Sequence, residues 1–218
     1  KLSQLSFRKV KDSHVLTRLA PHVVDKLLVC DISFLKNSID GEWKTAFRGT
    51  PPPPWLYVNG RPMPLARWPN EQGWEGGWAE FSHVVDTGAP QPNSAEPSVH
   101  ARRPGAFVFD SPRVAKWNLR EGVWLMGYWT HDWYEEVIRI GSYDPMNKVI
   151  TLAASHIYGI GRGTWGKKTR RFYAMNLIEE LDAPGEWYID RKTWRLYFLP
   201  PLNLHNTRII LATLTQPL

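Results

Sequence analysis

Residues 171–201, RFYAMNLIEELDAPGEWYIDRKTWRLYFLPP, decide the fold class of this chain. Residues 172–181 are predicted to hold a short helix, and Asp182-Ala183-Pro184-Gly185 has the composition of a tight turn. Residues 186–201 then form two aromatic-rich segments, and Asp190 opens the turn between them. The stretch therefore predicts an antiparallel hairpin whose aromatic side chains fill a core.

Short apolar segments bounded by turn residues precede and follow this hairpin. Asn59-Gly60 is a two-residue hairpin signal, and Pro62 and Pro64 place the strand after it at a sheet edge. Asp12 is positioned to cap a short helix that Pro21 divides or ends. Further strands are expected at residues 1–10, 26–33, 123–129, 134–144, 149–153 and 208–214. About ten short strands predict an all-β fold, an antiparallel β-sandwich or barrel-like domain with one or two short helices.

The composition favours one β-rich domain over residues 1–218. The chain has 18 Pro and 16 Gly, which favour turns over long helices. Its 12 Trp, 8 Tyr and 8 Phe either fill a core or face flat ligands such as sugars. Residues 86–105 are rich in Pro, Ser and Ala and poor in apolar residues, so we expect a mobile loop there.

The charge pattern argues against nucleic acid as a partner. The net charge is +6, but the basic residues are scattered apart from one cluster at 167–171. No recognisable nucleic-acid module accompanies that cluster. We also expect no membrane partner, because no apolar run approaches a membrane span. Cys30 lies in the apolar run LLVCDI and is interpreted as a small buried hydrophobe.

Candidate chemistry is limited. The seven His residues lack metal-binding spacing, and no phosphate loop is present, so we expect no metal and no cofactor. His131 and Asp132 lie among tryptophans in GYWTHDWYEE, and a turn containing a satisfied His is favoured over an acid–base pair. Five carboxylates of the deciding stretch are assigned structural roles, and no catalytic residue is proposed: Glu179, Glu180, Asp182, Glu186 and Asp190. The candidate substrate-binding residues are Trp68, Trp74, Trp78, Trp129, His131 and Asp132.

Several blocks resemble, in order, the insertion domain of right-handed parallel β-helix proteins similar to glycoside hydrolase family 141. The blocks are SFRKVKDSHVLTRLAP (6–21), KLLVCDI (26–32), LYVNGRPMPLARWPNEQGW (56–74), VWLMGYWTHDWYEEVIRI (123–140) and NLIEELDAPGEWYIDRKTWRLYFLPP (176–201). The chain departs from the family at Trp194, where a Gly is usual, and this predicts a different hairpin turn. Residues 86–105 also form a longer, more proline-rich loop than the family has.

The resemblance implies a non-catalytic accessory domain of a carbohydrate-active β-helix protein. Residues 1–10 and 207–218 would be its exit and re-entry strands, so the two ends should lie close together. Its partners would be the rest of its own chain and a polysaccharide, and its location would be secreted or periplasmic in a bacterium. Two alternatives stay open. One is a stand-alone carbohydrate-binding module that uses exposed Trp, and the other is a protein-interaction module.

Overall fold

A computed structural model describes residues 5–39, 46–47, 54–73, 76–81, 83–88, 103–161, 170–201 and 203–213. The chain forms two compact units. Unit 1 comprises Lys1–Trp43, Pro51–Asn70 and Asn176–Leu218, and unit 2 comprises Lys44–Thr50 and Glu71–Met175. Unit 1 is thus built from three separate stretches of sequence, and the deciding hairpin belongs to it.

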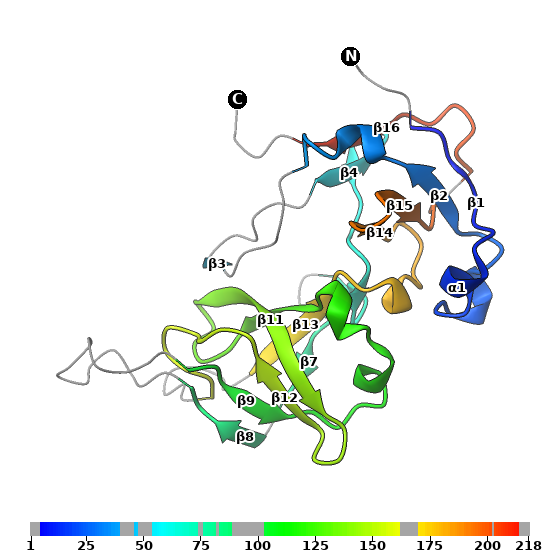
Figure 1. The fold of residues 1–218 in the computed structure, drawn as a ribbon. Helices are drawn as coiled ribbons and strands as arrows, with labels where there is room; N and C mark the ends of the chain where they lie inside the picture. Colours follow the sequence, from blue (N-terminus) through cyan, green and yellow to red (C-terminus); the bar gives the residue numbers. More distant parts are fainter. Residues whose placement is uncertain are drawn as a thin grey trace. The chain divides into compact units, whose positions relative to one another are not determined.

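The central sheet of unit 1 joins the N-terminal strands to the deciding hairpin. Its strands run in the order β1-β2-β15-β14 and pair antiparallel, so that blue β1 and β2 lie beside orange β15 and β14 in Figure 1. The bounds are β1 Arg8–Lys9, β2 Leu28–Asp31, β14 Trp187–Asp190 and β15 Arg195–Phe198.

This sheet separates two hydrophobic clusters. Leu196 and Phe198 project from one face of β15 into a cluster with Cys30 and Trp187, whereas Tyr197 projects from the other face into a second cluster. The period of two along a strand produces this division. The predicted role of the aromatics in core and hairpin packing is confirmed, since Trp187, Tyr188, Tyr197 and Phe198 are all buried. Cys30 is also buried, as predicted, and its burial raises the pKa of the thiol.

A second sheet of unit 1 contains the predicted Asn-Gly hairpin. Its order is β16-β4-β5, so β5 lies at the edge, as its prolines predicted. Asn59 (φ 50°) and Gly60 (φ 79°) both adopt the left-handed conformation that a tight two-residue turn requires. The bounds are β4 Trp55–Val58, β5 Arg61–Pro62 and β16 Ile209–Ala212. The short strand β6, Arg67–Trp68, lies in unit 1 but does not belong to this sheet.

The described residues nearest to the two ends of the chain pack against the same cluster. Leu5 and Phe7 precede β1, and Ile209 and Leu211 belong to β16. All four side chains contact the cluster that contains Trp187 and Phe198. Residues far apart in sequence therefore meet at one side of the central sheet.

The helices of unit 1 are short. Asp12 caps α1 (Ser13–Leu16) by accepting a hydrogen bond from the His14 amide at 3.1 Å, as predicted. Single turns of 3-10 helix follow at η1 Pro21–Val23, η2 Ser33–Leu35 and η5 Ile178–Glu180. The prediction of a helix over residues 172–181 is wrong. The first half of this segment belongs to strand β13 (Arg171–Met175), and only η5 is helical. Pairing of β13 with another strand overrides the local preference of that segment.

Glu186 anchors the turn of the deciding stretch. Its carboxylate accepts hydrogen bonds from the backbone amides of Arg67 (3.3 Å), Asp182 (2.9 Å) and Ala183 (3.0 Å). The Asp182 side chain in turn accepts a hydrogen bond from Asn70 at 2.8 Å. We call these residues the polar lock. The lock explains the ARWPN and DAPGEW motifs, because each motif supplies one half of it.

The turn between β14 and β15 follows the prediction at Asp190, but the different turn type expected at Trp194 finds no support in the backbone. Asp190 accepts hydrogen bonds from the Lys192 and Thr193 amides at 2.8 and 3.3 Å. Trp194 has φ 56°, the left-handed region that favours Gly. The Trp194 side chain packs against the cluster on β15, and this contact offsets the strain of its backbone.

Unit 2 is a single antiparallel sheet in the order β13-β10-β11-β12-β9-β8, with β7 on β13 and β3 on β11. The sheet curves from yellow β13 through green β11 and β9 in Figure 1. Its strands are β3 Ala46–Phe47, β7 Ala79–Glu80, β8 His83–Asp86, β9 Ala106–Val108, β10 Trp124–Tyr128, β11 Glu135–Asp144, β12 Val149–Leu152 and β13 Arg171–Met175, with 3-10 turns η3 Val114–Lys116 and η4 Leu119–Glu121.

The core of unit 2 is aromatic and requires one glycine. Trp129 stacks on Phe172, with ring centroids 6.1 Å apart and planes 13° apart. A Cβ atom on Gly127 would lie 2.8 Å from the Trp129 ring and 3.1 Å from the Phe172 Cβ. The strand predicted at 123–129 therefore needs Gly127 so that the indole can pack against its backbone.

The all-β antiparallel class with few short helices is confirmed. Most of the loop predicted over 86–105 lies outside the described residues, but its two ends are joined by an ion pair between Asp86 and Arg103 at 2.9 Å. Trp74, Lys167 and Lys168 also lie outside the described residues. Within the described ranges, no helix has both the length and the hydrophobicity needed to cross a membrane.

Candidate functional site

The loop between β10 and β11 brings three of the predicted residues of unit 2 together, Trp129, His131 and Asp132. The two strands pair in register from Trp124 with Arg139 to Tyr128 with Glu135, so residues 129–134 form the hairpin loop. Trp129 opens the loop but is fully buried, and its indole N–H donates to the Glu136 carbonyl at 2.9 Å. Trp129 therefore serves the core rather than a ligand, which corrects its place among the candidate binding residues.

His131 and Asp132 point to different partners. The His131 ring stacks on Trp133, with centroids 5.0 Å and planes 9° apart. Asp132 lies 4.0 Å from the Arg171 guanidinium. The predicted turn is confirmed, but the prediction that hydrogen bonds satisfy His131 is wrong at Nδ1, which is buried and has no hydrogen-bond partner among the described residues. Aromatic contacts hold this ring instead.

Five rings from two segments form what we call the loop cluster. Three come from the hairpin loop and two come from the segment after β12. Trp133 is 53% exposed and presents the most accessible ring of the group. The Tyr158 ring meets His131 at 5.1 Å, Trp133 at 5.7 Å and Tyr134 at 5.1 Å, in edge-to-face geometry. The members are His131, Trp133, Tyr134, His156 and Tyr158.

His156 is the buried base of the loop cluster. Its Nδ1 lies 2.7 Å from the Gly159 carbonyl, and its Nε2 lies 3.6 Å from the Glu136 carboxyl group. Burial lowers the pKa of His156 to about 4, and the nearby His131 lowers it further, although the bond to Gly159 opposes the shift. The imidazole is therefore neutral at neutral pH, and its approach to Glu136 is not an ion pair.

A second group of rings, the strand cluster, surrounds Arg171 on β13. The guanidinium lies 5.1 Å from the Trp78 ring centroid and 4.7 Å from that of Tyr128. Trp78 also contacts Tyr128 and Tyr173, with centroids 5.5 and 5.3 Å apart. Arg171 links this group to the hairpin loop through Asp132, so the two clusters are connected within unit 2.

The combined arrangement offers aromatic and charged groups of the kind that sugar binding uses. Aromatic faces can stack on the apolar faces of sugar rings, and charged side chains beside them can bond to hydroxyl groups. Glycoside hydrolysis instead uses two carboxyl groups that face the same bond. Asp132 faces Arg171 and Glu136 faces His156, so these two carboxyl groups have different partners.

The remaining candidates are placed differently. Trp68 is half-buried on β6 and belongs to unit 1, whereas Trp78, His131 and Asp132 belong to unit 2. Sequence reasoning missed Trp133 and Tyr158 as candidate binding residues. The motif GYWTHDWYEE contains Trp133, but Trp129 and Trp133 are four positions apart, so strand alternation does not distinguish a buried ring from an exposed one. Tyr158 joins the cluster through the fold, and no local pattern marks it.

Glu186 has a strongly perturbed carboxyl group in unit 1. Burial raises the pKa of Glu186 to about 8, although the three amide donors of the polar lock favour its charged form. A perturbed carboxyl group can indicate an acid catalyst. Here its oxygens are occupied by backbone amides, which supports the structural role expected of it. The described part of the chain contains no group of three or more His, Cys, Asp or Glu side chains that would hold a metal ion.

Comparisons with known proteins leave the family open but identify the fold. No protein-family description matches the chain, and no curated protein matches it. One solved structure, described as a glycoside hydrolase, is similar with a TM-score of 0.52 and 17% identity. The similarity covers 86% of this chain and 29% of that one, so the chain spans under a third of its structural relative. At this identity the likeness shows a shared, glycoside hydrolase-like fold.

Proposed function

We propose that the chain is a non-catalytic accessory domain of a carbohydrate-active protein, inserted in a parallel β-helix scaffold. One observation carries the proposal: the chain matches 29% of a glycoside hydrolase over 86% of its own length. A segment of that proportion is the size of a module within the larger enzyme. Its partner would be the rest of its own chain, in a secreted or periplasmic protein.

The packing of the terminal segments supports insertion. Leu5 and Phe7 contact the same cluster as Ile209 and Leu211. An inserted domain leaves and rejoins its scaffold at neighbouring points, so its first and last strands must lie close together.

The test of this proposal is hydrolysis by the 218-residue chain alone. We expect no release of reducing ends from a panel of neutral and acidic polysaccharides, because the carboxyl groups of the candidate site face other side chains. Robust hydrolysis of any polysaccharide by this chain would contradict the accessory role.

A specific observation favours a second function, carbohydrate binding by unit 2. The indole of Trp133 is exposed, and it is held rigid by stacking on His131 and by the edge of Tyr158. A fixed, exposed ring is the element that sugar stacking requires, because little conformational entropy is lost on binding. Trp78 and Arg171 provide a second aromatic and charged group nearby in the same unit.

Affinity electrophoresis in gels that contain polysaccharide tests this second function. We expect at least one neutral polysaccharide to retard the chain, and we expect Trp133→Ala to migrate freely. Trp55→Ala is the matched control, because Trp55 is also exposed (46%) but lies on β4 in unit 1. Equal retardation of Trp133→Ala and the unmodified chain would exclude this surface.

A further inference from the structure

A row of side chains across the sheet of unit 2 holds Arg171 in place. Strand register pairs Tyr128 with Glu135 on one side and with Arg171 on the other. Arg171 pairs in turn with Glu80, so these four side chains share one face of the sheet. The guanidinium is fixed between two rings, because the centroids of Trp78 and Tyr128 lie 5.1 and 4.7 Å from it.

The guanidinium of Arg171 has hydrogen-bonding capacity left. Its Nε is buried and has no hydrogen-bond partner among the described residues. The Asp132 carboxylate lies 4.0 Å from a terminal nitrogen of the guanidinium, beyond the roughly 2.7–3.2 Å of a hydrogen bond. Both side chains are partly exposed, Arg171 at 32% and Asp132 at 34%. A ligand can therefore reach the donor and the acceptor at once.

The gap between these two groups matches a hydroxyl group. One oxygen at about 2.8 Å from each group can span the 4.0 Å gap, because it accepts from the guanidinium and donates to the carboxylate. A uronate carboxylate offers acceptors only, and an ammonium group offers donors only. Of these three groups, the hydroxyl alone suits both sides of the gap.

The exposed indole of the loop cluster lies at the same turn. Asp132 and Trp133 are the two central residues of a turn that the Tyr134 amide closes by donating to the His131 carbonyl at 3.2 Å. Trp133 is 53% exposed, so this turn presents an aromatic ring and a carboxylate together. A sugar that stacks on the ring can place one of its hydroxyl groups in the gap.

Carboxylates outnumber cations around this gap. Among the described side chains, Asp132 faces Arg171 and Glu80 is its cross-strand neighbour. Glu135 lies two strands away in the same row. Arg170 precedes Arg171 and therefore projects from the opposite face, toward Gly161. An anionic ligand would thus meet three carboxylates and one guanidinium, which disfavours a uronate.

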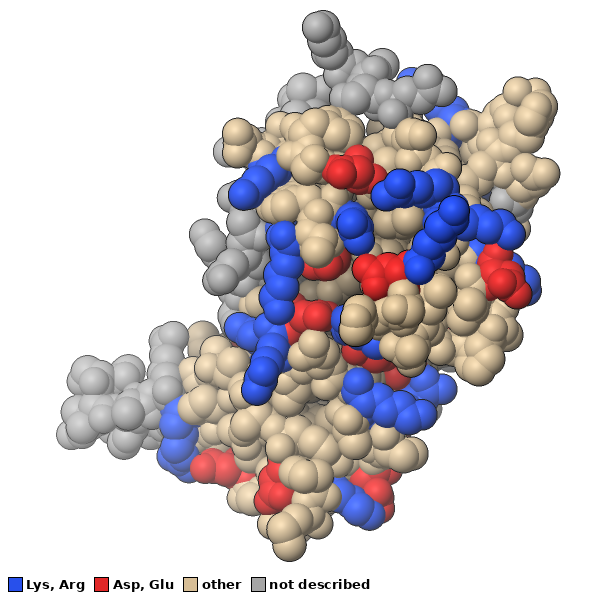
Figure 2. Space-filling view, turned by 45° about the vertical axis from the view of Figure 1, so that its right-hand side comes forward, with Lys and Arg blue, Asp and Glu red and all other residues tan. Residues whose placement is uncertain are grey.

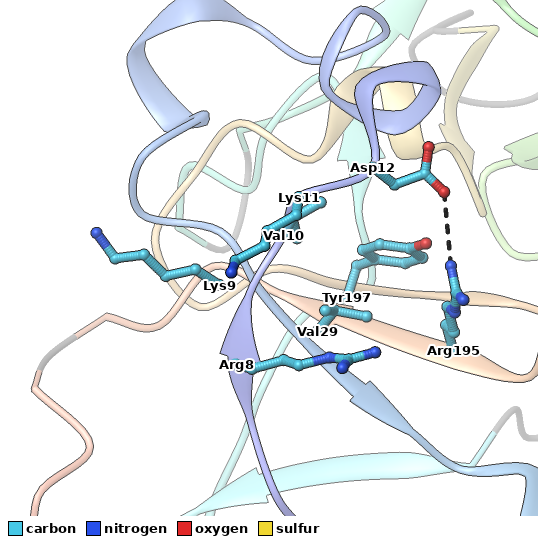
Figure 3. A pocket seen from close by; sticks show the side chains of 8 residues that line it. All are labelled: Arg8, Lys9, Val10, Lys11, Asp12, Val29, Arg195 and Tyr197. Atoms are coloured by element: carbon cyan, nitrogen blue, oxygen red, sulfur yellow. Dashed lines mark ion pairs between the residues drawn. The ribbon is translucent and has the colours of Figure 1, made fainter.

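The charged groove of unit 1 lacks the exposed ring that a stacked sugar needs. The ring that lines it, Tyr197, is only 2% exposed (Figure 3). Register places Asp31 and Asp190 beside Arg195. Asp12 lies 3.5 Å from the same guanidinium, and Figure 2 likewise shows acidic side chains lying among basic ones. An exposed ring and a bridgeable charge pair occur together at the hairpin loop of unit 2.

We propose that Asp132 and Arg171 bind a hydroxyl group of a neutral sugar stacked on Trp133 and select against uronates. The inference rests on the proposed carbohydrate binding by unit 2 and names its ligand class as neutral polysaccharide. Asp132 and Arg171 are the specificity-determining pair of this site.

The test is calorimetric titration of the 218-residue chain with two matched pairs of β-1,4-linked oligosaccharides. The pairs are glucan with glucuronan and mannan with mannuronan, of equal length, so that the members of a pair differ only in their carboxylates. We expect at least one neutral oligosaccharide to bind, and its matched uronate to bind at least tenfold more weakly. High salt should narrow this difference, because it screens the repulsion.

Variants separate the roles of the two side chains. Asp132→Ala should weaken neutral binding about tenfold, because a charged hydrogen-bond acceptor is lost. Asp132→Asn keeps an acceptor oxygen but removes the charge, so the preference for the neutral member of a pair should fall severalfold. Arg171→Lys keeps the charge but loses the planar fork and should also weaken neutral binding. Asp110→Asn is the matched control, since Asp110 is another exposed carboxylate of unit 2 that faces a cation, Lys148.

Two results would overturn the proposal while carbohydrate binding by unit 2 stands: equal or tighter binding of the uronates, or unchanged neutral binding by Asp132→Ala. In both cases Trp133→Ala would still abolish binding of the neutral ligand. A lack of binding by both neutral oligosaccharides would also overturn the proposal. Affinity electrophoresis of the unmodified chain with other polysaccharides then shows whether the binding function fails as well.

Discussion

The polar lock of unit 1 and the loop cluster of unit 2 are both rich in buried polar groups, but they use them differently. In the lock, each oxygen of Glu186 accepts backbone hydrogen bonds, and Asp182 is bonded to Asn70, whose own Oδ1 is buried without a hydrogen-bond partner among the described residues. In the loop cluster, His131 Nδ1 and His156 Nε2 are buried without hydrogen-bond partners among the described residues, while Trp133 is exposed. Three backbone amides bonded to one carboxyl group stabilise the turn of the lock, whereas in the loop cluster two unsatisfied ring nitrogens lie beside an exposed indole.

The largest expected effect is on the lock. Glu186→Ala leaves three backbone amides without their acceptor, and each buried unsatisfied donor costs about 1–3 kcal/mol. We expect a loss of about 4 kcal/mol in the free energy of unfolding, measured by urea denaturation. Glu71→Ala, at an exposed carboxylate of unit 2, should change it by less than about 0.5 kcal/mol. A cost below about 1 kcal/mol for Glu186→Ala would show that the lock does not stabilise unit 1.

The loss of stability at acidic pH tests the loop cluster. The pKa of His156 is about 4 in the folded protein, below its ordinary value of 6.5. The unfolded chain therefore binds a proton first, and stability is lost as the pH falls from about 6.5 to about 4. The shift corresponds to roughly 3 kcal/mol at most.

His156→Gln should flatten this part of the stability profile relative to the unmodified chain. His205→Gln, at an exposed His of unit 1, should leave the profile unchanged. Parallel profiles for His156→Gln and the unmodified chain, measured by thermal unfolding across this pH range, would contradict a buried neutral His156.

Overpacking the core beneath the hairpin loop of unit 2 is expected to have a smaller effect on the free energy of unfolding. Gly127→Ala places a Cβ 2.8 Å from the Trp129 ring, and overpacking of a core costs about 2 kcal/mol. Gly73→Ala is a control for the backbone alone, because Gly73 has positive φ but open space around it, and it should cost about 1 kcal/mol. Chemical denaturation measures both variants, and equal costs would show that Trp129 does not require the glycine.

Trp133→Ala should have the smallest effect on stability and the largest effect on polysaccharide binding. Trp133→Ala removes an exposed ring, so the free energy of unfolding should change by less than about 0.5 kcal/mol. Retardation by polysaccharide should nevertheless disappear. A Trp133→Ala variant that unfolds much more easily would assign this ring to the core and would remove the contrast between the two regions.

Local rules predicted much of unit 1. The Asn59-Gly60 turn, the Asp12 cap and the Asp190 turn each depend on a few neighbouring residues, and all three were predicted. The helix expected at 172–181 failed because β13 pairs with β10, a partner distant in sequence.

The candidate site was only partly predictable. The tryptophans of residues 129–133 were recognised as a group, but only the hairpin geometry shows that Trp129 is buried and Trp133 exposed. Tyr158 and His156 reach the loop from after β12 through tertiary folding, so no spacing in the sequence marks them. The register that joins β1, β2 and β15 likewise brings together strands distant in sequence.

The indole N–H resonances of the tryptophans provide the most direct test of the contrast. The buried Trp187 and Trp129 donate to the Met63 and Glu136 carbonyls, at 2.8 and 2.9 Å, and serve as internal references in the two units. On titration with an oligosaccharide from a polysaccharide that retards the chain, we expect the Trp133 resonance, assigned by its loss in Trp133→Ala, to shift while the Trp187 resonance stays fixed. A shift of the Trp187 resonance with no shift of the Trp133 resonance would contradict both assignments: ligand binding by the loop cluster of unit 2, and a purely structural role for the polar lock of unit 1.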